Sequence, residues 1–134
     1  MYLLDTNACI RILNNSSLSL VTQLHQHKPS DIFLCSVVKG ELVYGAFHSA
    51  HPAENLRVLE KFFEPFISLP FDDQSSLIYG RIRSDLARNG TIIGPNDLLI
   101  AAIAISNNLT LISANIREFG RIAGLSLANW EAAQ

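Results

Sequence analysis

The sequence predicts an α/β fold in which a central, mostly parallel sheet is covered by helices on both faces, as three α/β/α layers. Short apolar runs typical of buried strands alternate along the chain with longer segments of helical apolar spacing. One helical segment, 96–106, is apolar nearly all round, which indicates a helix buried on several sides. Hydrophobic residues make up 49% of the 134 residues, so we expect one domain spanning 1–134 with a single core.

The first predicted strand covers residues 2–4, and the polar residues that follow suit a strand end and a helix start. The next helix is predicted within 16–28 and is ended by a proline. Its apolar positions recur at helical spacing as Leu18, Val21 and Leu24.

A second strand is predicted over 32–35, followed by a helix over 37–47 with Ser36 as its N-cap. Another helix is predicted over 52–63, with a proline at its start. Residues 66–69 lie between two prolines and form a third candidate strand.

The helix of the middle region begins at a cap supplied by Asp72 or Asp73 and ends near Gly90. Its predicted apolar face comprises Leu77, Ile78, Ile82 and Leu86. The apolar helix 96–106 comes next, and strands are predicted over 110–113 and 125–127.

Ten basic and twelve acidic residues give a net charge of −2, which excludes the strong positive field of many sequence-independent nucleic-acid binders. Any contact with a nucleic acid must therefore be local. Five basic residues of the second half could line one side of a site or be scattered, solvated arginines: Arg81, Arg83, Arg88, Arg117 and Arg121.

The two cysteines, Cys9 and Cys35, lie among apolar residues and are interpreted as small buried hydrophobes. The N-terminus lacks the residue order of a signal peptide, and no apolar run approaches the length of a membrane span. We therefore expect a soluble protein of the reducing cytoplasm.

Acidic residues mark the ends of the predicted strands, where ligands of parallel sheets usually bind. Asp5 directly follows the first strand, Glu41 lies one turn into the helix after the second, and Glu118 follows Asn115 after a later strand. Asp97 stands in the first turn of the apolar helix. Taken singly, these acids could be helix caps, dipole partners or solvated side chains.

Taken together, converging carboxylates repel one another unless a cation neutralises them, so the combination predicts a divalent metal. Oxygen ligands favour magnesium, with manganese as a substitute, over zinc. Such an ion can activate water and offset charge on a phosphate, as phosphodiester hydrolysis requires. On this hypothesis Asp5 and Asp97 hold the principal metal, and Glu41 and Glu118 complete the cluster through water, a second metal or base action.

Polar residues beside these acids could orient waters and carboxylates: Asn7, Ser36 and Asn115. Histidines offer a competing metal site, since they form two close pairs: His25 with His27, and His48 with His51. Neighbours two apart on a helix point in different directions, and the second pair has no matched cysteine or acid. The histidines are therefore interpreted as surface or helix-end residues.

Four motifs carry a family resemblance: MYLLDTN, SVVKGELVYGA, IGPNDLLIAAIA and TLISANIREFGRIAGLSLANW. Together and in this order they resemble the PIN-domain nucleases, specifically the VapC-type toxins. The resemblance implies a PIN-like α/β/α domain, a magnesium-dependent endoribonuclease and a cognate antitoxin partner. It further implies a homodimer within a larger toxin–antitoxin complex and RNA as substrate, with transfer RNA, cut in the anticodon loop of the initiator, as the narrower expectation.

The family's acids carry over to Asp5, Glu41 and Asp97, since each lies inside a matching motif. Many relatives have an aspartate where this chain has Asn115, and here the acid arrives three residues later as Glu118. We interpret Asn115, Arg117 and Glu118 as a variant of the same corner.

The main alternative is a non-catalytic α/β interaction module, in which the acids are caps and surface groups; Asn115 favours it. A receiver-like signalling domain also places acids at strand ends. Receivers have a lysine late in the sheet, whereas Lys61 is the last lysine here, and we set that interpretation aside.

Overall fold

Five parallel strands form one sheet at the centre of the structure, a computed structural model that describes residues 1–131. The strand order is β3-β2-β1-β4-β5, and every neighbouring pair is parallel. The strands are β1 (Tyr2–Leu4), β2 (Ile32–Cys35), β3 (Ile67–Leu69), β4 (Thr110–Ile112) and β5 (Leu127–Ala128). The predicted α/β class with a mostly parallel sheet is confirmed, since crossover helices join parallel strands and cover both faces.

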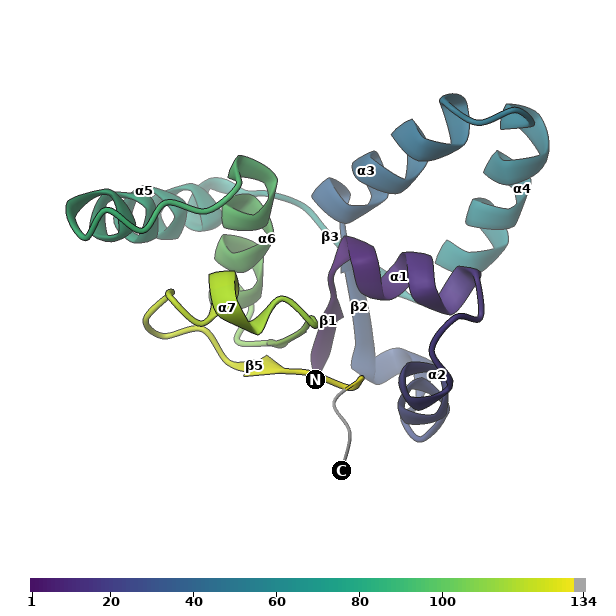
Figure 1. The fold of residues 1–134 in the computed structure, drawn as a ribbon, viewed down its shortest axis with the longest axis horizontal. Helices are drawn as coiled ribbons and strands as arrows, with labels where there is room; N and C mark the ends of the chain where they lie inside the picture. Colours follow the sequence, from purple (N-terminus) through teal and green to yellow (C-terminus); the bar gives the residue numbers. More distant parts are fainter. Residues whose placement is uncertain (132–134) are drawn as a thin grey trace.

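Helices lie in two groups on either side of this sheet (Figure 1). One group comprises α1 (Thr6–Leu13), α2 (Leu18–His25), α3 (Ser36–Phe47) and α4 (Pro52–Phe63). The other comprises α5 (Asp73–Arg88), α6 (Pro95–Ser106) and the short α7 (Ile116–Phe119). A 3₁₀ turn, η1 (Pro29–Asp31), leads into β2.

The core is built from the strands β1, β2 and β4 and from the helix α6. Leu3, Leu34 and Leu111 are fully buried, and so is the α6 segment 100–104. Burial of each large aliphatic side chain contributes about 1.5–3 kcal/mol relative to exposure. The near-continuous apolar run of α6 is thereby explained, because the helix contacts other elements on several sides, including α3, α5 and β4.

Aspartate side chains cap the N-termini of two helices, α1 and α5. Asp5 caps α1 by accepting a hydrogen bond from the Ala8 amide at 2.8 Å. Asp72, one of the two predicted caps, accepts one from the Ser75 amide at 2.9 Å and caps α5. The hydrogen bonds that Ser75 donates lower the pKa of Asp72, because they stabilise its charged form.

The predicted N-cap of α3 is wrong. Ser36 is the first residue of α3, whereas Cys35 holds the cap position without a side-chain bond, and the Ser36 hydroxyl instead lies 3.5 Å from the Leu69 carbonyl. The helix predicted within 16–28 is confirmed as α2, but its fully buried apolar residue is Leu20, which is not one of the three predicted apolar positions.

Two leucines assigned to apolar helix faces are in fact exposed. Leu18 is 80% exposed and Leu77 is 77% exposed, whereas Ile82 and Leu86 are buried as predicted. Helical spacing identifies a stripe, but the width of the stripe that a helix buries depends on the neighbours it meets.

The cysteines are buried and three of the histidines are exposed, as predicted, whereas His27 is partly buried and its ring stacks on Trp130. Cys9 and Cys35 are free and buried, and removal from water raises the pKa of both thiols. His48 and His51 lie at the end of α3 and the start of α4. Within residues 1–131, no helix combines the length and the apolar character needed to cross a bilayer.

Candidate active site

Asp5 is a buried carboxylate at the carboxyl end of β1, the central strand of the sheet. It follows β1, whose Leu4 pairs with Ile112 of β4, so Asp5 and Ser113 emerge side by side from adjacent strands. Removal from water raises the pKa of Asp5, while hydrogen bonds from Ser113 and the Ala8 amide oppose that rise. Keeping the buried carboxylate of Asp5 charged therefore costs free energy, and a bound cation would lower that cost.

Glu41 belongs to α3 and is held by Thr6, the first residue of α1. The Thr6 hydroxyl donates a 2.6 Å hydrogen bond to Glu41 Oε1, joining residues 35 positions apart in the sequence. Because this bond occupies one carboxylate oxygen, the other remains free to accept from water or a ligand. Glu41 itself is partly buried.

Asp97 lies in the first turn of α6, against the wall of the core. Partial burial raises its pKa to about 6, and the charges of Glu118, Glu41 and Asp5 add to the rise. Those three charges act on Asp97 because they lie close enough for Coulombic repulsion. The four predicted acids therefore come together, although each belongs to a different segment of the chain.

Glu118 belongs to the corner after β4 and is organised by Asn115. The Asn115 side chain caps α7 by accepting from the Glu118 amide at 3.4 Å, and its Nδ2 donates to Glu118 Oε2 at 3.0 Å. The Ser113 hydroxyl accepts from the Asn115 amide at 2.9 Å, which links this corner to the neighbour of Asp5. Asn115 therefore orients an acid here rather than replacing one.

The donor set suits a hard divalent ion, since it consists of carboxylates, a hydroxyl and an amide. Burial, and after it the charges of three nearby acids, raise the pKa of Asp97, and a cation would offset the cost of keeping this carboxylate charged. In the described part of the chain, no three acidic, histidine or cysteine side chains form a ready-made cluster around one point. The oxygen donors of these acids are nevertheless of the type that divalent ions prefer.

The other residues predicted to support the site are distributed unevenly. Asn7 is exposed and lines a pocket with Thr6 and Glu41. Asn115 is partly buried at the Glu118 corner, whereas Ser36 and Arg117 are exposed.

The arginines of the second half do not form one basic wall. Arg83 contacts Tyr79, with its Nη1 2.8 Å from the phenol oxygen, and Arg88 lies 3.7 Å from Asp85. Arg121 donates to the Ile92 carbonyl at 3.2 Å. Arg81 and Arg117 are exposed, which favours the interpretation of scattered solvated arginines.

Sequence reasoning missed two residues that position the acids, Thr6 and Ser113. Thr6 stands next to Asp5 and Ser113 ends its strand, so their location at the carboxyl ends of strands was a usable signal. Their partners could not be inferred, because those contacts depend on packing of α1 against α3 and on the register of β1 with β4.

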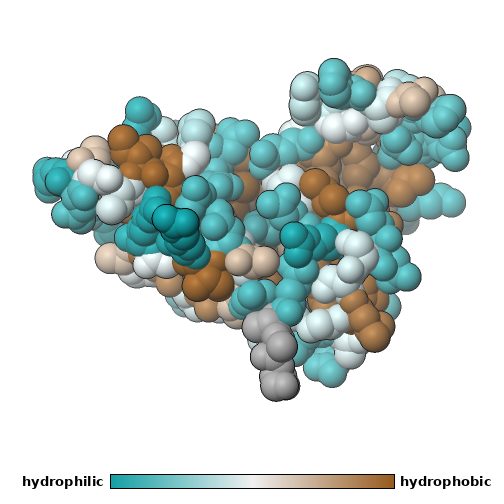
Figure 2. Space-filling model, in the orientation of Figure 1, coloured by the Kyte–Doolittle hydropathy of each residue, from teal (hydrophilic) through white to brown (hydrophobic). Residues whose placement is uncertain are grey.

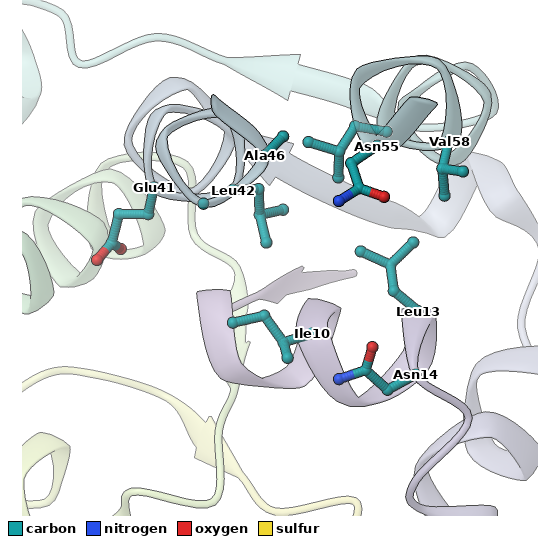
Figure 3. A pocket seen from close by; sticks show the side chains of 10 residues that line it. Ile10, Leu13, Asn14, Glu41, Leu42, Ala46, Asn55 and Val58 are labelled. Carbon is teal, nitrogen blue, oxygen red and sulfur yellow. The ribbon is translucent and has the colours of Figure 1, made fainter. Parts of the chain in front are cut away.

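A second feature beside the acids is an apolar groove of about 470 Å³ between α1 and the α3–α4 pair. Figure 3 shows Ile10 and Leu13 of α1 facing Leu42 and Val58, with Glu41 at one end of the groove. Figure 2 shows the matching hydrophobic surface in the hollow between these helices. The groove therefore leads from exposed apolar surface to the carboxylates.

Comparisons with known proteins agree with the fold. The family model described as "PIN domain" matches residues 2–125. The chain is 39% identical to "Ribonuclease VapC2" of Rickettsia felis over 98% of both chains. It is 37% identical to "tRNA(fMet)-specific endonuclease VapC" of Salmonella typhimurium, over 96% of this chain and 97% of that protein.

The fold also matches a solved assembly, VapBC2 of Rickettsia felis bound to a DNA fragment from its promoter. The TM-score is 0.90 at 37% identity, and the match covers 96% of this chain and 98% of that chain. The family's divalent-metal chemistry agrees with the oxygen donors gathered around Asp97. With a full-length sequence match, a full-length structural match and four converging acids, the chain belongs to the PIN-domain family and, within it, to the VapC-type ribonucleases.

Proposed function

We propose that this protein is a magnesium-dependent endoribonuclease and the toxin of a toxin–antitoxin pair, and that residues 1–134 work as one catalytic domain. The observation that carries the proposal is the convergence of four acids from separate segments: burial of Asp97 and the nearby charges of Glu118, Glu41 and Asp5 together raise the pKa of Asp97 to about 6. An arrangement of like charges costs stability, and a bound cation offsets that cost. Manganese would substitute for magnesium, because both prefer oxygen ligands.

In the proposed mechanism Asp5 and Asp97 would hold the principal ion, and Glu41 would complete the ligand set directly or through water. A bound divalent ion supplies positive charge to the phosphate and lowers the pKa of a water molecule. Glu41, held by the Thr6 hydroxyl at 2.6 Å, keeps one oxygen free to accept the proton of the attacking water. Glu118 is oriented by Asn115 toward the same space and completes the catalytic set.

Other side chains would support this chemistry. Ser113 donates to Asp5 and so keeps its carboxylate oriented. Asn7 and Arg117 are exposed near the acids and offer polar and positive contacts to RNA. Ser36, whose hydroxyl lies near the carbonyl of Leu69 at the end of β3, is a weaker candidate for a supporting residue.

The proposed substrate is RNA with an accessible single-stranded phosphate, and transfer RNA is the favoured example. A relative that is 37% identical is named as specific for tRNA(fMet). A single-stranded loop suits this site, because unstacked bases expose the phosphate that the acids and metal must reach. We therefore propose the anticodon loop of the initiator as the first RNA to test.

The proposed partner is an antitoxin that occupies the apolar groove between α1 and the α3–α4 pair (Figure 3). The groove ends at Glu41, so an apolar helix or tail lying in it could place a basic side chain against the carboxylates. The Rickettsia felis relative was solved as a VapBC2 assembly on promoter DNA, and we infer a comparable complex, built on a toxin homodimer, in the cytoplasm.

Purified protein should cleave initiator transfer RNA when magnesium or manganese is present, and a chelator should stop the reaction. The matched variants are Asp97→Asn, which should abolish cleavage, and Asp73→Asn, which should not, because Asp73 is a first-turn aspartate of another helix and is not among the charges that raise the pKa of Asp97. Cleavage that persists in chelator, or in folded Asp97→Asn, would contradict the mechanism.

Thermal unfolding provides a readout that does not need catalysis. Magnesium should raise the unfolding temperature of the wild type and should not raise that of Asp97→Asn, because an ion that binds only the folded protein stabilises it. If magnesium stabilises neither protein and no RNA is cut, the non-catalytic interaction module becomes the better interpretation.

A further inference from the structure

Beside the catalytic acids lies a second pocket of about 640 Å³, and the proposed chemistry gives no role to its residues Gly40, Tyr44 and Asn96. It opens between the start of α1, the exposed side of α3 and the first turn of α6. Its walls include Thr6 and Asn7 on one side, Tyr44 on another and Asn96 on a third. Glu41 also lines it, so the pocket is adjacent to the acids.

Tyr44 presents an aromatic ring to solvent at this pocket. The residue is 67% exposed, and its ring stacks on His48 with a centroid distance of 5.5 Å and an interplanar angle of 11°. A large exposed aromatic ring has no role in the core. Stacking one turn along the helix holds the Tyr44 ring as a platform for a flat ligand.

Gly40 keeps the space beside Tyr44 open. It stands four residues earlier on α3, lines the pocket, and a Cβ built on it would meet no atom within 4 Å. Any larger residue at this position would extend its side chain toward the same space, because positions four apart share one helix face.

The remaining lining combines apolar side chains, Ile10 and Val37, with polar ones, and it carries no positive charge. Asn7 and Asn96 offer amide donors and acceptors, and among the lining residues within 1–131 none is lysine or arginine. Such a wall suits a neutral group with hydrogen-bonding edges better than it suits a phosphate. A nucleobase has that chemistry, since it combines a flat stacking face with donor and acceptor edges.

We propose that the pocket of Tyr44, Asn7 and Asn96 binds the nucleobase next to the scissile phosphate, with the base stacked on Tyr44. The proposal rests on the proposed ribonuclease function. Glu41 and Tyr44 are three residues apart on α3, so their side chains start about 5–6 Å from each other. A phosphate at the acids therefore leaves its neighbouring base within reach of the Tyr44 ring.

The first experiment measures binding without cleavage, in the Asp97→Asn background. The probe is a short single-stranded oligoribonucleotide carrying 2-aminopurine, whose fluorescence is quenched when the base stacks. Tyr44→Leu should weaken binding on the order of 10-fold and remove the quenching, because one base–aromatic stack contributes about 1–3 kcal/mol. Tyr44→Phe retains a ring and should bind more tightly than Tyr44→Leu.

Two matched controls separate the pocket from general effects on α3. Phe47→Leu removes another exposed aromatic side chain of the same helix, outside the pocket, and should leave probe binding unchanged. Gly40→Leu should block the pocket without harming the helix, whereas Gly80→Leu changes an equally open glycine on α5 and should have no effect.

The second experiment uses an abasic nucleotide on each side of the mapped cut. One abasic substitution should slow cleavage by the wild type about 10-fold or more and should have little further effect on Tyr44→Leu. Independent, multiplying effects would overturn the proposal. A Tyr44→Leu protein that binds the probe and cleaves RNA as well as the wild type does would also overturn it.

A third result would assign the pocket to a protein partner. If Tyr44→Leu cleaves normally but escapes inhibition by the antitoxin, the ring contacts that protein and the nucleobase proposal is wrong. Tyr44-dependent probe binding without any cleavage would instead contradict only the proposed ribonuclease function.

Discussion

Replacing Asp97 by asparagine should stabilise the metal-free protein at neutral pH while abolishing its activity. A pKa raised from 3.8 to about 6 in the folded state means that folding disfavours the charged carboxylate. The full shift corresponds to about 3 kcal/mol at ~1.36 kcal/mol per unit. Because Asp97 is half-buried, solvent screening reduces the expected gain of Asp97→Asn to about 1 kcal/mol.

The gain in stability from Asp97→Asn should depend on pH. The carboxyl pKa is raised on folding, so its cost is full above about pH 6 and disappears as the pH falls through the unfolded value near 3.8. The stability advantage of Asp97→Asn over the wild type should therefore be largest at pH 7.5 and shrink between pH 6 and pH 4. Asparagine keeps the size of the side chain, so packing changes little.

Urea unfolding in the presence of a chelator measures the effect, with equal m-values as a check on two-state behaviour. Asp73→Asn is the matched control, because it removes a first-turn aspartate from α5 and should give no gain at either pH. An Asp97→Asn protein that is no more stable at pH 7.5, or equally more stable at pH 4, would refute the argument from repelling carboxylates.

Three further predictions test the positioning of the acids and the packing of the fold. Thr6→Val removes the 2.6 Å bond to Glu41 and should lower kcat/KM several-fold in RNA cleavage, whereas Thr22→Val, on exposed surface, should not. In urea unfolding, Ile82→Ala should cost about 2–5 kcal/mol, whereas exposed Leu77→Ala should change stability by less than about 0.5 kcal/mol. Gly90→Ala should cost about 1 kcal/mol in the same assay, because Gly90 has φ +66° at the end of α5.

The elements with strong local patterns were predictable almost to the residue. The strand 32–35 and the helix 52–63 agree with β2 and α4, because a short apolar run and a proline-started amphipathic segment each satisfy one set of local rules. The caps were less predictable. Ser36 is a good N-cap residue by type, yet the backbone of β2 runs directly into α3 and leaves the cap position to Cys35.

The acids were predictable by type and position, and Asn115 was predicted among the residues that orient them, whereas Thr6 and Ser113 were not. Asp5, Glu41 and Asp97 each stand where a parallel sheet gathers ligands, and the resemblance to a known family marked the same residues. Nothing local in the sequence connects Thr6 with Glu41 or relates Tyr44 to Asn96. Those relations join segments far apart in the chain, and only packing brings them together.

By itself the sequence determined the α/β class, the order of strands and helices, and the four carboxylates, because periodicity and residue type act over short stretches of chain. The tertiary structure alone decided that Asp97 faces three other acids, that Glu41 is held by Thr6, and that Tyr44 stands over an open pocket. The physical reason is that charge repulsion, hydrogen bonding and cavity shape depend on distances through space, and sequence spacing does not set those distances.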